Sequence, residues 1–487
     1  MKQKLFDFAS VFACLFYGIS FSLINIARFR QFQSFYYDFG IFARVIYQLS
    51  RFKAPIIDHY TFGLINAFAD HFNPGIVIFS PLFWFTNNPE ILLVVQVIFV
   101  ALSGYMLYLT SKVLTKNSFF SFGVTLPYLL FLGLQNALIA DFHPEVAALL
   151  PISLSLYFLA KKKIFLYFLF LIISFTFKES IALFALYLGI FLILTRQYKI
   201  GVLTLFSGIT WLGITTKFLI PLFSPENRYF YAPHYPLNPL KLIINVADEA
   251  MERKTLLTSL ASFSFLPLFA PQAWILAFGD FIARFAPESS VFGNKDLTMH
   301  YSAIAAIGLA FATIGAYPIL KRLGQKIVSF FCLTLIFVPL ILSSRPVLNG
   351  PLNLIYNPDF FRSIKNHQKT ELFLTQIPKE GIIMTHNSLA VRFPDRDLLL
   401  LRQEYPCYQP DLILINAEAG QNPNNFWELN YDNVGQIIQK LKGDTDYKLS
   451  YQQNNKYIFS RITEHRGDFS RQGILRCTAE FKSSPVK

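Results

Sequence analysis

The apolar run FASVFACLFYGISFSLINIA, residues 8–27, decides the class of fold to which this chain belongs. A helix needs about 20 apolar residues to cross the hydrocarbon core of a bilayer, and this run supplies them. Lys2 and Lys4 precede the run as in a secretory signal peptide, but it is too long for one and lacks a small-residue cleavage pattern. The sequence therefore predicts a first transmembrane helix that is retained.

The composition extends this prediction to most of the chain. Of the 487 residues, 53% are hydrophobic and 15% are charged, and 54 are phenylalanine. Soluble domains carry about 25% charged residues, so the composition excludes an ordinary water-soluble enzyme. A net charge of +13 would raise the question of nucleic acid in a soluble protein. Here membrane topology accounts for most of the basic residues, and no nucleic-acid partner is expected.

Apolar segments separated by short polar loops predict an α-helical polytopic membrane protein with about eleven transmembrane helices. The expected helices are residues 8–27, 91–111, 118–135, 146–160, 164–177, 180–195, 200–223, 256–270, 272–285, 301–320 and 327–343. Residues 28–90 form a mixed first loop, in which the apolar stretch 75–85 is too short to span and is typical of an interfacial or re-entrant helix.

Basic residues predict the orientation of these helices. Short loops rich in Lys and Arg stay in the cytoplasm. With a cytoplasmic N-terminus, the expected inner loops are those that contain Lys112 and Lys116, residues 161–163, Arg196 and Lys199, and Lys321, Arg322 and Lys326. The loop 28–90 and everything after residue 343 then lie outside, in a bacterial-type plasma membrane.

The composition changes near residue 344, which divides the chain into a transmembrane domain, 1–343, and a small extracytoplasmic α/β domain, 344–487. Short apolar runs at 381–384, 398–401 and 411–416 predict strands, 431–441 a helix, and 447–459 a terminal hairpin. Cys407 and Cys477 in this domain either form a disulfide or remain free thiols. There is no Walker loop, Rossmann glycine fingerprint or nucleophile elbow.

Ionisable residues recur at positions that this topology places on the outer side. They are Asp38 in YYDFG, Asp70 and His71, Asp141, His143 and Glu145 in DFHPE, Lys178 and Glu179, and His300 and Tyr301. Ionisable groups are costly to bury in a membrane and usually mark a function or a water-filled cavity. Together they predict a polar pocket at the outer membrane surface.

Each cluster also has a purely structural interpretation. Asp141 is a candidate N-cap of the helix that starts near Pro144. Lys178 and Glu179 form a plausible polar turn whose charges reach the interface, and Asp70 with His71 fits a turn before Asn73-Pro74. His300 and Tyr301 are ordinary in an interfacial aromatic belt.

In this order, the motifs resemble those of the bacterial and archaeal membrane proteins known as domain of unknown function 2079 (DUF2079). That family is similar to the C-type (GT-C) glycosyltransferase superfamily, whose members have many transmembrane helices and a carboxylate in a long first outer loop. The resemblance implies transfer of a sugar from a polyprenyl-phosphate donor to an unidentified acceptor at the outer membrane surface. The superfamily's paired acidic motif is reduced here to Asp38.

Sugar transfer with inversion needs a carboxylate that takes the acceptor's proton while the lipid phosphate leaves. Asp38 is the expected catalytic base, and Arg44, His71, His143 and Lys178 are the expected phosphate ligands. The expected supporting polar residues are Asp70, Asp141, Glu145, Glu179, His300 and Tyr301. Asp141, His143, Glu145 and His71 also offer oxygen and nitrogen ligands for a divalent metal.

Two other classes of function remain open. A transporter or lipid-handling protein would use the same polar groups as a path for substrate or protons. Against it, no pair of segments has the matched Gly or Pro breaks of inverted repeats. A sensor is disfavoured because the chain has no recognisable cytoplasmic output domain.

Overall fold

The computed structural model describes residues 2–59, 61–288, 294–462, 473, 474 and 476–478. The chain forms two compact units, each built from segments that are separate in the sequence. Unit 1 comprises Met1–Ile26, Phe68–Ile78 and Ile91–Pro358, and unit 2 comprises Ala27–Ala67, Phe79–Glu90 and Asp359–Lys487. The domain boundary predicted between 343 and 344 stays a prediction.

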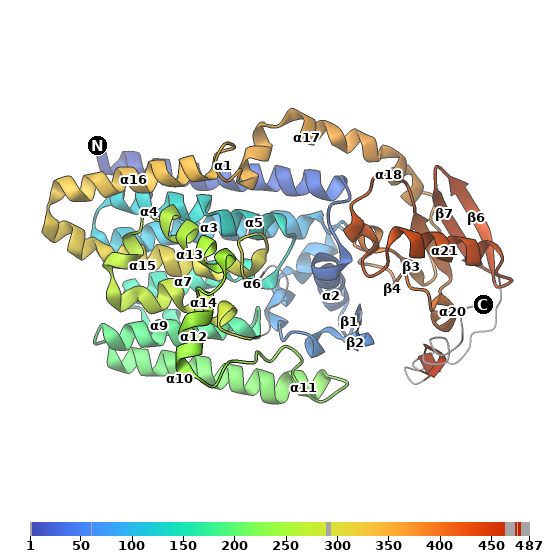
Figure 1. The fold of residues 1–487 in the computed structure, drawn as a ribbon, viewed down its shortest axis with the longest axis horizontal. Coiled ribbons are helices and arrows are strands. Elements are labelled where there is room, and N and C mark those ends of the chain that lie inside the picture. Colours follow the sequence, from blue (N-terminus) through green and yellow to red (C-terminus); the bar gives the residue numbers. More distant parts are fainter. Residues whose placement is uncertain (1, 60, 289–293, 463–472, 475, 479–487) are drawn as a thin grey trace. The chain divides into compact units, whose positions relative to one another are not determined.

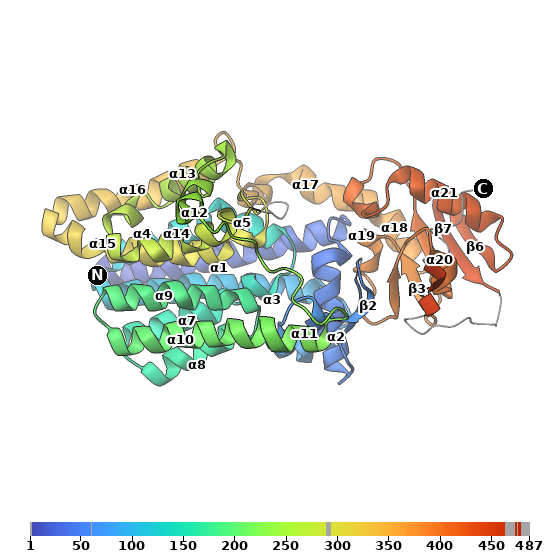
Figure 2. The same cartoon turned by 60° about the horizontal axis from the view of Figure 1, so that its bottom comes forward.

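Unit 1 is built from helices, most of which lie side by side along their length (Figures 1 and 2). Helix α1 begins here and continues into unit 2. The helices are α1 (Lys2–Arg30), α3 (Glu90–Thr115), α4 (Ser118–Leu130), α5 (Leu132–Ile139), α6 (Pro144–Ala147), α7 (Leu149–Ala160), α8 (Ile164–Phe175), α9 (Ala182–Leu194), α10 (Tyr198–Ile214), α11 (Ile220–Phe223), α12 (Pro239–Asn245), α13 (Ala250–Ser262), α14 (Trp274–Phe285), α15 (Ala303–Leu323) and α16 (Gln325–Ser343).

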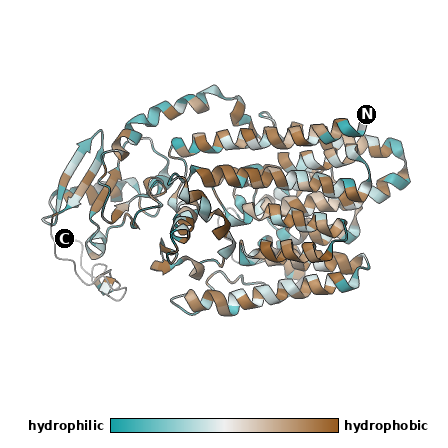
Figure 3. Ribbon diagram, turned by 180° about the vertical axis from the view of Figure 1, so that it is seen from behind, coloured by the Kyte–Doolittle hydropathy of each residue, from teal (hydrophilic) through white to brown (hydrophobic). Residues whose placement is uncertain are grey.

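The helices of unit 1 consist largely of hydrophobic residues (Figure 3), and many of their large apolar side chains are exposed, which supports membrane insertion. In the part of the chain that the structure describes, the segments long and apolar enough to cross a bilayer are Gln3–Arg30, Glu90–Thr115, Tyr198–Phe223, His300–Leu323 and Gln325–Ser343. Helices α4 and α5, bent by 47° at their junction, give a sixth if counted together. The predicted count of about eleven is not confirmed.

The predicted pair of spans at 256–270 and 272–285 corresponds to helices that are shorter than a bilayer crossing. Helix α13 has 13 residues and α14 has 12. At 1.5 Å per residue each is shorter than about 20 Å, against the ~30 Å of a hydrocarbon core. Helix α13 also carries Glu252, Arg253 and Lys254 near its start.

The first residues of the chain lie beside the end of α3. The Lys112 ammonium at the end of α3 lies 2.6 Å from Asp7 near the start of α1, and the Tyr108 hydroxyl also donates to that carboxylate. Asn117, before α4, donates to the hydroxyl of Tyr317 in α15 at 3.3 Å. Lys112 thus lies at the same end as the N-terminus, as the predicted topology requires, and which side of the membrane this end faces stays a prediction.

Unit 2 contains a five-stranded mixed sheet of order β4-β3-β5-β7-β6. Strand β3 pairs in parallel with β4 and β5, whereas β7 pairs antiparallel with β5 and β6. The strands are β3 (Ile383–Thr385), β4 (Leu398–Leu400), β5 (Leu412–Asn416), β6 (Tyr447–Gln453) and β7 (Lys456–Arg461). The strands and terminal hairpin predicted from short apolar runs are confirmed.

The predicted helix of this region is confirmed as α21 (Tyr431–Lys442). Asn430 caps it, because its side chain accepts a hydrogen bond from the backbone of Asn433. Its apolar face joins the core formed with the sheet. Other α-helices and strands of unit 2 are α2 (Ile41–Ser50), β1 (Ile56–His59), β2 (Gly63–Asn66), α17 (Pro358–Arg362), α18 (Gln368–Leu374), α19 (Asn387–Ala390) and α20 (Tyr405–Tyr408).

A disulfide joins Cys407 in α20 to Cys477, with their Cα atoms 5.6 Å apart. Of the two alternatives that the sequence left open, the structure therefore has the bridged form. Cys14 and Cys332 are buried free thiols. All four cysteines of the chain are thus either paired or buried.

Close packing of α14 against α15 predicts that Gly308→Ala destabilises the protein. A Cβ atom at Gly308 would lie 2.1 Å from the carbonyl oxygen of Leu276, and backbone cannot move away cheaply. We expect a loss of about 1–3 kcal/mol, seen as a lower unfolding temperature in detergent. Gly213→Ala in α10 is the matched control, because its Cβ would enter open space. Equal stability of the two variants would contradict this packing.

Candidate functional site

Glu145 is the centre of a charged network in unit 1. Its Oε1 atom accepts a hydrogen bond from the Lys178 ammonium at 2.7 Å and lies 3.2 Å from Nε2 of His300. The His300 ring stacks on the ring of His143, with their centroids 3.6 Å apart. Because Glu145, His143 and His300 are all buried, the carboxylate depends on these neighbours for compensation.

The turn before α6 places Glu145 in this position. Pro144 occupies the first position of α6, where its fixed backbone angle suits a helix start. Gln96 of α3 holds the turn, donating to the carbonyl of Asp141 at 2.9 Å and accepting from the amide of His143 at 2.6 Å. His143 is the N-cap, and Asp141 lies two residues earlier with φ 70°. The interpretation of Asp141 as the N-cap is therefore wrong.

Glu179 is the centre of a second set of contacts in the same unit. Its carboxylate accepts hydrogen bonds from the backbone amide of Phe72 at 3.1 Å and the hydroxyl of Tyr229 at 3.0 Å. The His71 Nδ1 atom lies 2.8 Å from the same group. Glu179 follows Lys178 directly, so the two sets of contacts form one network.

Asp70 joins this network through Tyr231, whose hydroxyl donates to it at 2.6 Å and whose ring stacks on His71. The segment is fixed by Gly75, whose amide donates to the carbonyl of Thr176 at 2.7 Å. A Cβ at Gly75 would lie 2.4 Å from the Thr176 hydroxyl, so this close approach requires glycine.

Neighbouring carboxylates stabilise the charged forms of His71 and Lys178, which lie in loops. Burial lowers the pKa of His71, but the Glu179 carboxylate more than offsets this, so the pKa lies above its usual value. Burial also lowers the pKa of Lys178, and Glu145 with Glu179 raises it further than burial lowers it. Both cations are therefore stabilised, and both are already paired with carboxylates.

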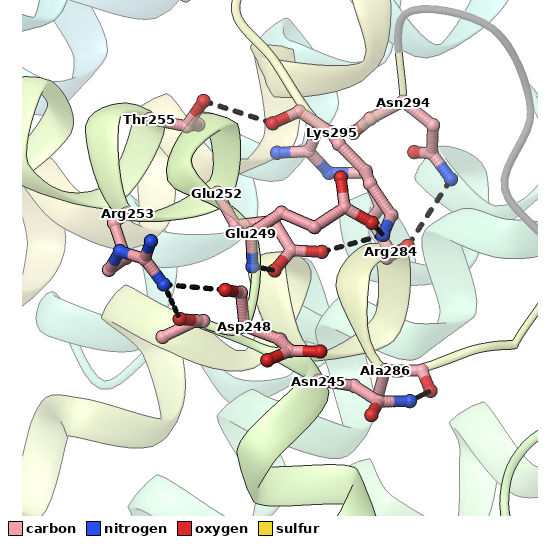
Figure 4. Close-up of polar contacts among 11 residues, drawn as sticks. Asn245, Asp248, Glu249, Glu252, Arg253, Thr255, Arg284, Ala286, Asn294 and Lys295 are labelled. Carbon is pink, nitrogen blue, oxygen red and sulfur yellow. Dashed lines mark hydrogen bonds and ion pairs between the residues drawn. The ribbon is translucent and has the colours of Figure 1, made fainter.

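A separate set of polar contacts fixes the segment that leads to His300. Lys295 lies 2.8 Å from Glu249 and 2.7 Å from the buried Glu252, and its carbonyl accepts from Thr255 (Figure 4). Arg284 donates to the carbonyl of Asn294 at 2.7 Å. These contacts tie α13 and α14 to the chain just before His300.

Asp38 lies in unit 2, in the segment that follows α1. It is exposed, with φ 78° and ψ −89°, a backbone conformation that is strained for a non-glycine residue. Gly40 makes the turn possible, because a Cβ there would lie 2.8 Å from the ring of Tyr36. Tyr36 and Phe39 are buried, so the turn is anchored on both sides of the exposed carboxylate.

Arg44, also in unit 2, has protein partners. Its guanidinium donates to Asp397 at 2.9 Å and to the carbonyl of Arg396. These contacts join α2 to the segment before β4, so they stabilise the unit. The expected phosphate-binding role of Arg44 stays a prediction.

The structure brings together most of the residues singled out from the sequence. Side-chain and backbone contacts in unit 1 link nine of them: Asp70, His71, Asp141, His143, Glu145, Lys178, Glu179, His300 and Tyr301. Sequence reasoning missed Gln96, Tyr229 and Tyr231. A signal existed for the two tyrosines, since they form an aromatic triplet with Phe230 inside a polar stretch.

Within the described ranges, no group of three or more His, Cys, Asp or Glu side chains is arranged to hold a metal ion. His71 contacts Glu179, whereas Glu145 contacts Lys178 and His300. The four candidate ligands Asp141, His143, Glu145 and His71 are thus divided between two sets of contacts.

Comparison with known proteins agrees with this description. Residues 28–458 match the model of a family described as predicted membrane protein (DUF2079). The chain belongs to this family. No match was found among curated proteins. The match includes residues 28–90, the charged network of unit 1 and most of the sheet of unit 2, so the whole set of candidate residues lies inside the matched region.

Loss of the Lys178 ammonium is expected to destabilise the DUF2079 chain strongly. Lys178→Met leaves the buried Glu145 without its closest cation, which typically costs about 3–5 kcal/mol. The double variant Lys178→Met/Glu145→Gln removes both charges and should recover part of this loss. Unfolding temperatures in detergent measure both effects. A double variant less stable than the single variant would contradict the pairing.

The raised pKa of His71 predicts a pH-dependent contribution to stability. The folded pKa lies above the unfolded value of about 6.5, so the contribution is fully present below that pH. It is lost as the pH rises through the folded pKa. The stability difference between wild type and His71→Gln should therefore shrink as the pH is raised from about 5 to about 9. A difference that is constant with pH would contradict a charged His71.

Proposed function

We propose that this DUF2079 protein is a membrane glycosyltransferase that transfers a sugar from a polyprenyl-phosphate donor to an acceptor at the membrane surface. The observation that carries the proposal is the exposed carboxylate of Asp38 on a strained turn directly after the first long apolar helix. Strained backbone at a non-glycine residue is frequent at functional sites. The C-type glycosyltransferases that the sequence motifs resemble have a carboxylate in the first outer loop, and this likeness supports the proposal.

Asp38 fits the role of base better than the other acidic candidates. Glu145 and Asp141 are buried, with exposed fractions of 6% and 7%, and Glu145 is neutralised by Lys178. A general base has to reach the acceptor hydroxyl and accept its proton. Asp38 is exposed, and its turn is held by buried aromatic neighbours.

The proposed reaction is a single displacement at the anomeric carbon. Asp38 takes the proton of the acceptor hydroxyl while the acceptor oxygen bonds to the anomeric carbon. The bond between that carbon and the phosphate oxygen breaks, and polyprenyl phosphate leaves with the electron pair. The assignment of Lys178, His71 and His143 as ligands of the donor phosphate stays a prediction from the sequence.

The side of the membrane is part of the proposal. A disulfide between Cys407 and Cys477 suits an oxidising compartment. Together with the basic loops, it supports an extracytoplasmic position for the sheet of unit 2 in a bacterial-type plasma membrane.

A transporter is the second candidate, because two observations favour it. Helices α4 and α5 are bent by 47° at a break, as in the discontinuous helices of some transporters. Glu145, Lys178 and His300 also form a buried ionisable network next to apolar helices. Proteoliposomes with an imposed proton gradient test this candidate directly, since a transporter moves its substrate without consuming a lipid-linked sugar.

The proposed base predicts the effect of Asp38→Asn. Loss of a general base lowers a rate by about 10² to 10⁴. Purified protein is incubated with a panel of polyprenyl-phosphate sugars and cell-envelope extract, and donor consumption is followed. Asp38→Asn should nearly abolish consumption while leaving the unfolding temperature unchanged.

Asp432→Asn is the matched control, because Asp432 is also an exposed aspartate of unit 2 and lies in the first turn of α21. It should retain normal turnover. Near-normal turnover in a folded Asp38→Asn protein would overturn the assignment of Asp38. Absence of donor consumption by the wild type with every sugar of the panel would count against transferase activity itself.

A further inference from the structure

Unit 2 contains a cavity of about 380 Å³, and none of its lining residues belongs to the charged network described above for unit 1. Its volume falls within the range of about 300–1,000 Å³ that is typical of small-molecule sites. Its walls combine aromatic rings with groups that form hydrogen bonds. Among the lining residues are Tyr37, Asn387, Arg402, Glu404, Trp427 and Glu428.

Two aromatic side chains form one wall of the cavity. The rings of Tyr37 and Trp427 meet edge to face, with centroids 4.6 Å apart. Trp427 is 47% exposed, so part of its face is available to a ligand. Asn387 fixes Tyr37, because its Oδ1 accepts from the Tyr37 amide at 3.1 Å, and its Nδ2 donates to the carbonyl of Asn424. The wall is thus preorganised.

The charges of the cavity disfavour an anionic ligand. The guanidinium of Arg402 is paired with the buried Asp58 and lies over the ring of Tyr408. Glu404 and Glu428 also line the cavity. One paired cation and two carboxylates do not match a phosphate group. The lipid phosphate of a donor is therefore not the expected occupant.

His386 contributes no charge either. Burial lowers its pKa to about 4, so the ring is neutral near pH 7. Its Nε2 accepts a hydrogen bond from the amide of Asn416 at 3.1 Å, which leaves Nδ1 to carry the proton toward the carbonyl of Asn425. Both ring nitrogens of His386 thus bond to the protein backbone, and His386 is a positioning residue of the cavity wall.

We propose that this cavity binds a neutral saccharide. A sugar ring presents C–H bonds on its faces and hydroxyl groups at its edge. The faces suit the aromatic wall of Tyr37 and Trp427, and the hydroxyls suit Arg402, Glu404 and Glu428. Asp38 follows Tyr37 in the chain, so the occupant is assigned as the acceptor. That assignment rests on the proposed function, whereas saccharide binding itself needs no turnover.

The disulfide fixes a further part of the cavity wall. Ile474 and Thr478 line the cavity, and Cys477 between them is bonded to Cys407 in α20. Tyr408 of the same helix also lines the cavity. Its hydroxyl accepts a hydrogen bond from the Arg402 guanidinium at 2.8 Å. Breaking the disulfide should therefore loosen the wall and weaken saccharide binding.

A glycan array tests the proposal with the full-length protein in detergent. The array carries neutral, acidic and amine-bearing saccharides, and bound fluorescently labelled protein is measured. The wild type should bind neutral saccharides. Trp427→Ala should lose about tenfold or more of the signal, because one aromatic face is removed. Trp427→Phe should retain part of it, and Cys477→Ser should bind less than wild type.

Trp274→Ala is the matched control, since Trp274 is 46% exposed and lies in α14 of unit 1. It should bind as the wild type does. Binding confined to acidic or amine-bearing saccharides, an unchanged signal for Trp427→Ala, or no binding at all would overturn the proposal. Because the array measures binding alone, a saccharide-binding protein that consumes no donor would contradict the transferase and leave the cavity assignment intact.

Discussion

Carboxylates buried among apolar helices need nearby cations, and the Glu145 and Glu179 network of unit 1 meets this requirement. An uncompensated charge in such a place costs several kcal/mol. The compensating charges come from Lys178 and His71, and His300, from a third part of the chain, lies 3.2 Å from Glu145. These segments must therefore come together for the unit to be stable, and Gln96 and Gly75 hold the backbones that carry them.

Pairing also limits what each acidic residue can do. Glu145 and Glu179 are committed to ion pairs, whereas Asp38 is exposed on a strained turn. Burial, and not residue type, therefore separates the carboxylates that stabilise the fold from the carboxylate that is proposed to act as a base. It supports the proposal that Asp38, and not Glu145 or Glu179, is the base.

The sequence predicted local elements better than pairings. Strand β5 and helix α21 were predictable, because an apolar run and an amphipathic pattern carry their own signal. The motifs at 70–71, 141–145 and 178–179 were expected to converge, and they do. The partners of single charged residues were not predictable. Arg44, for example, pairs with Asp397, which lies 353 positions further along the chain. The cavity of unit 2 was missed because its lining comes from several separate segments, none with a motif.

Accessibility of single cysteines in intact cells tests the central claim, that the charged motifs and the sheet of unit 2 belong to the outer side of the membrane. The native cysteines give little background, because two are buried and two are bridged. A membrane-impermeant thiol reagent should label Asp432→Cys in intact cells, and Lys162→Cys only after permeabilisation. Labelling of Lys162→Cys in intact cells, with Asp432→Cys protected, would contradict the orientation and the proposed site of reaction.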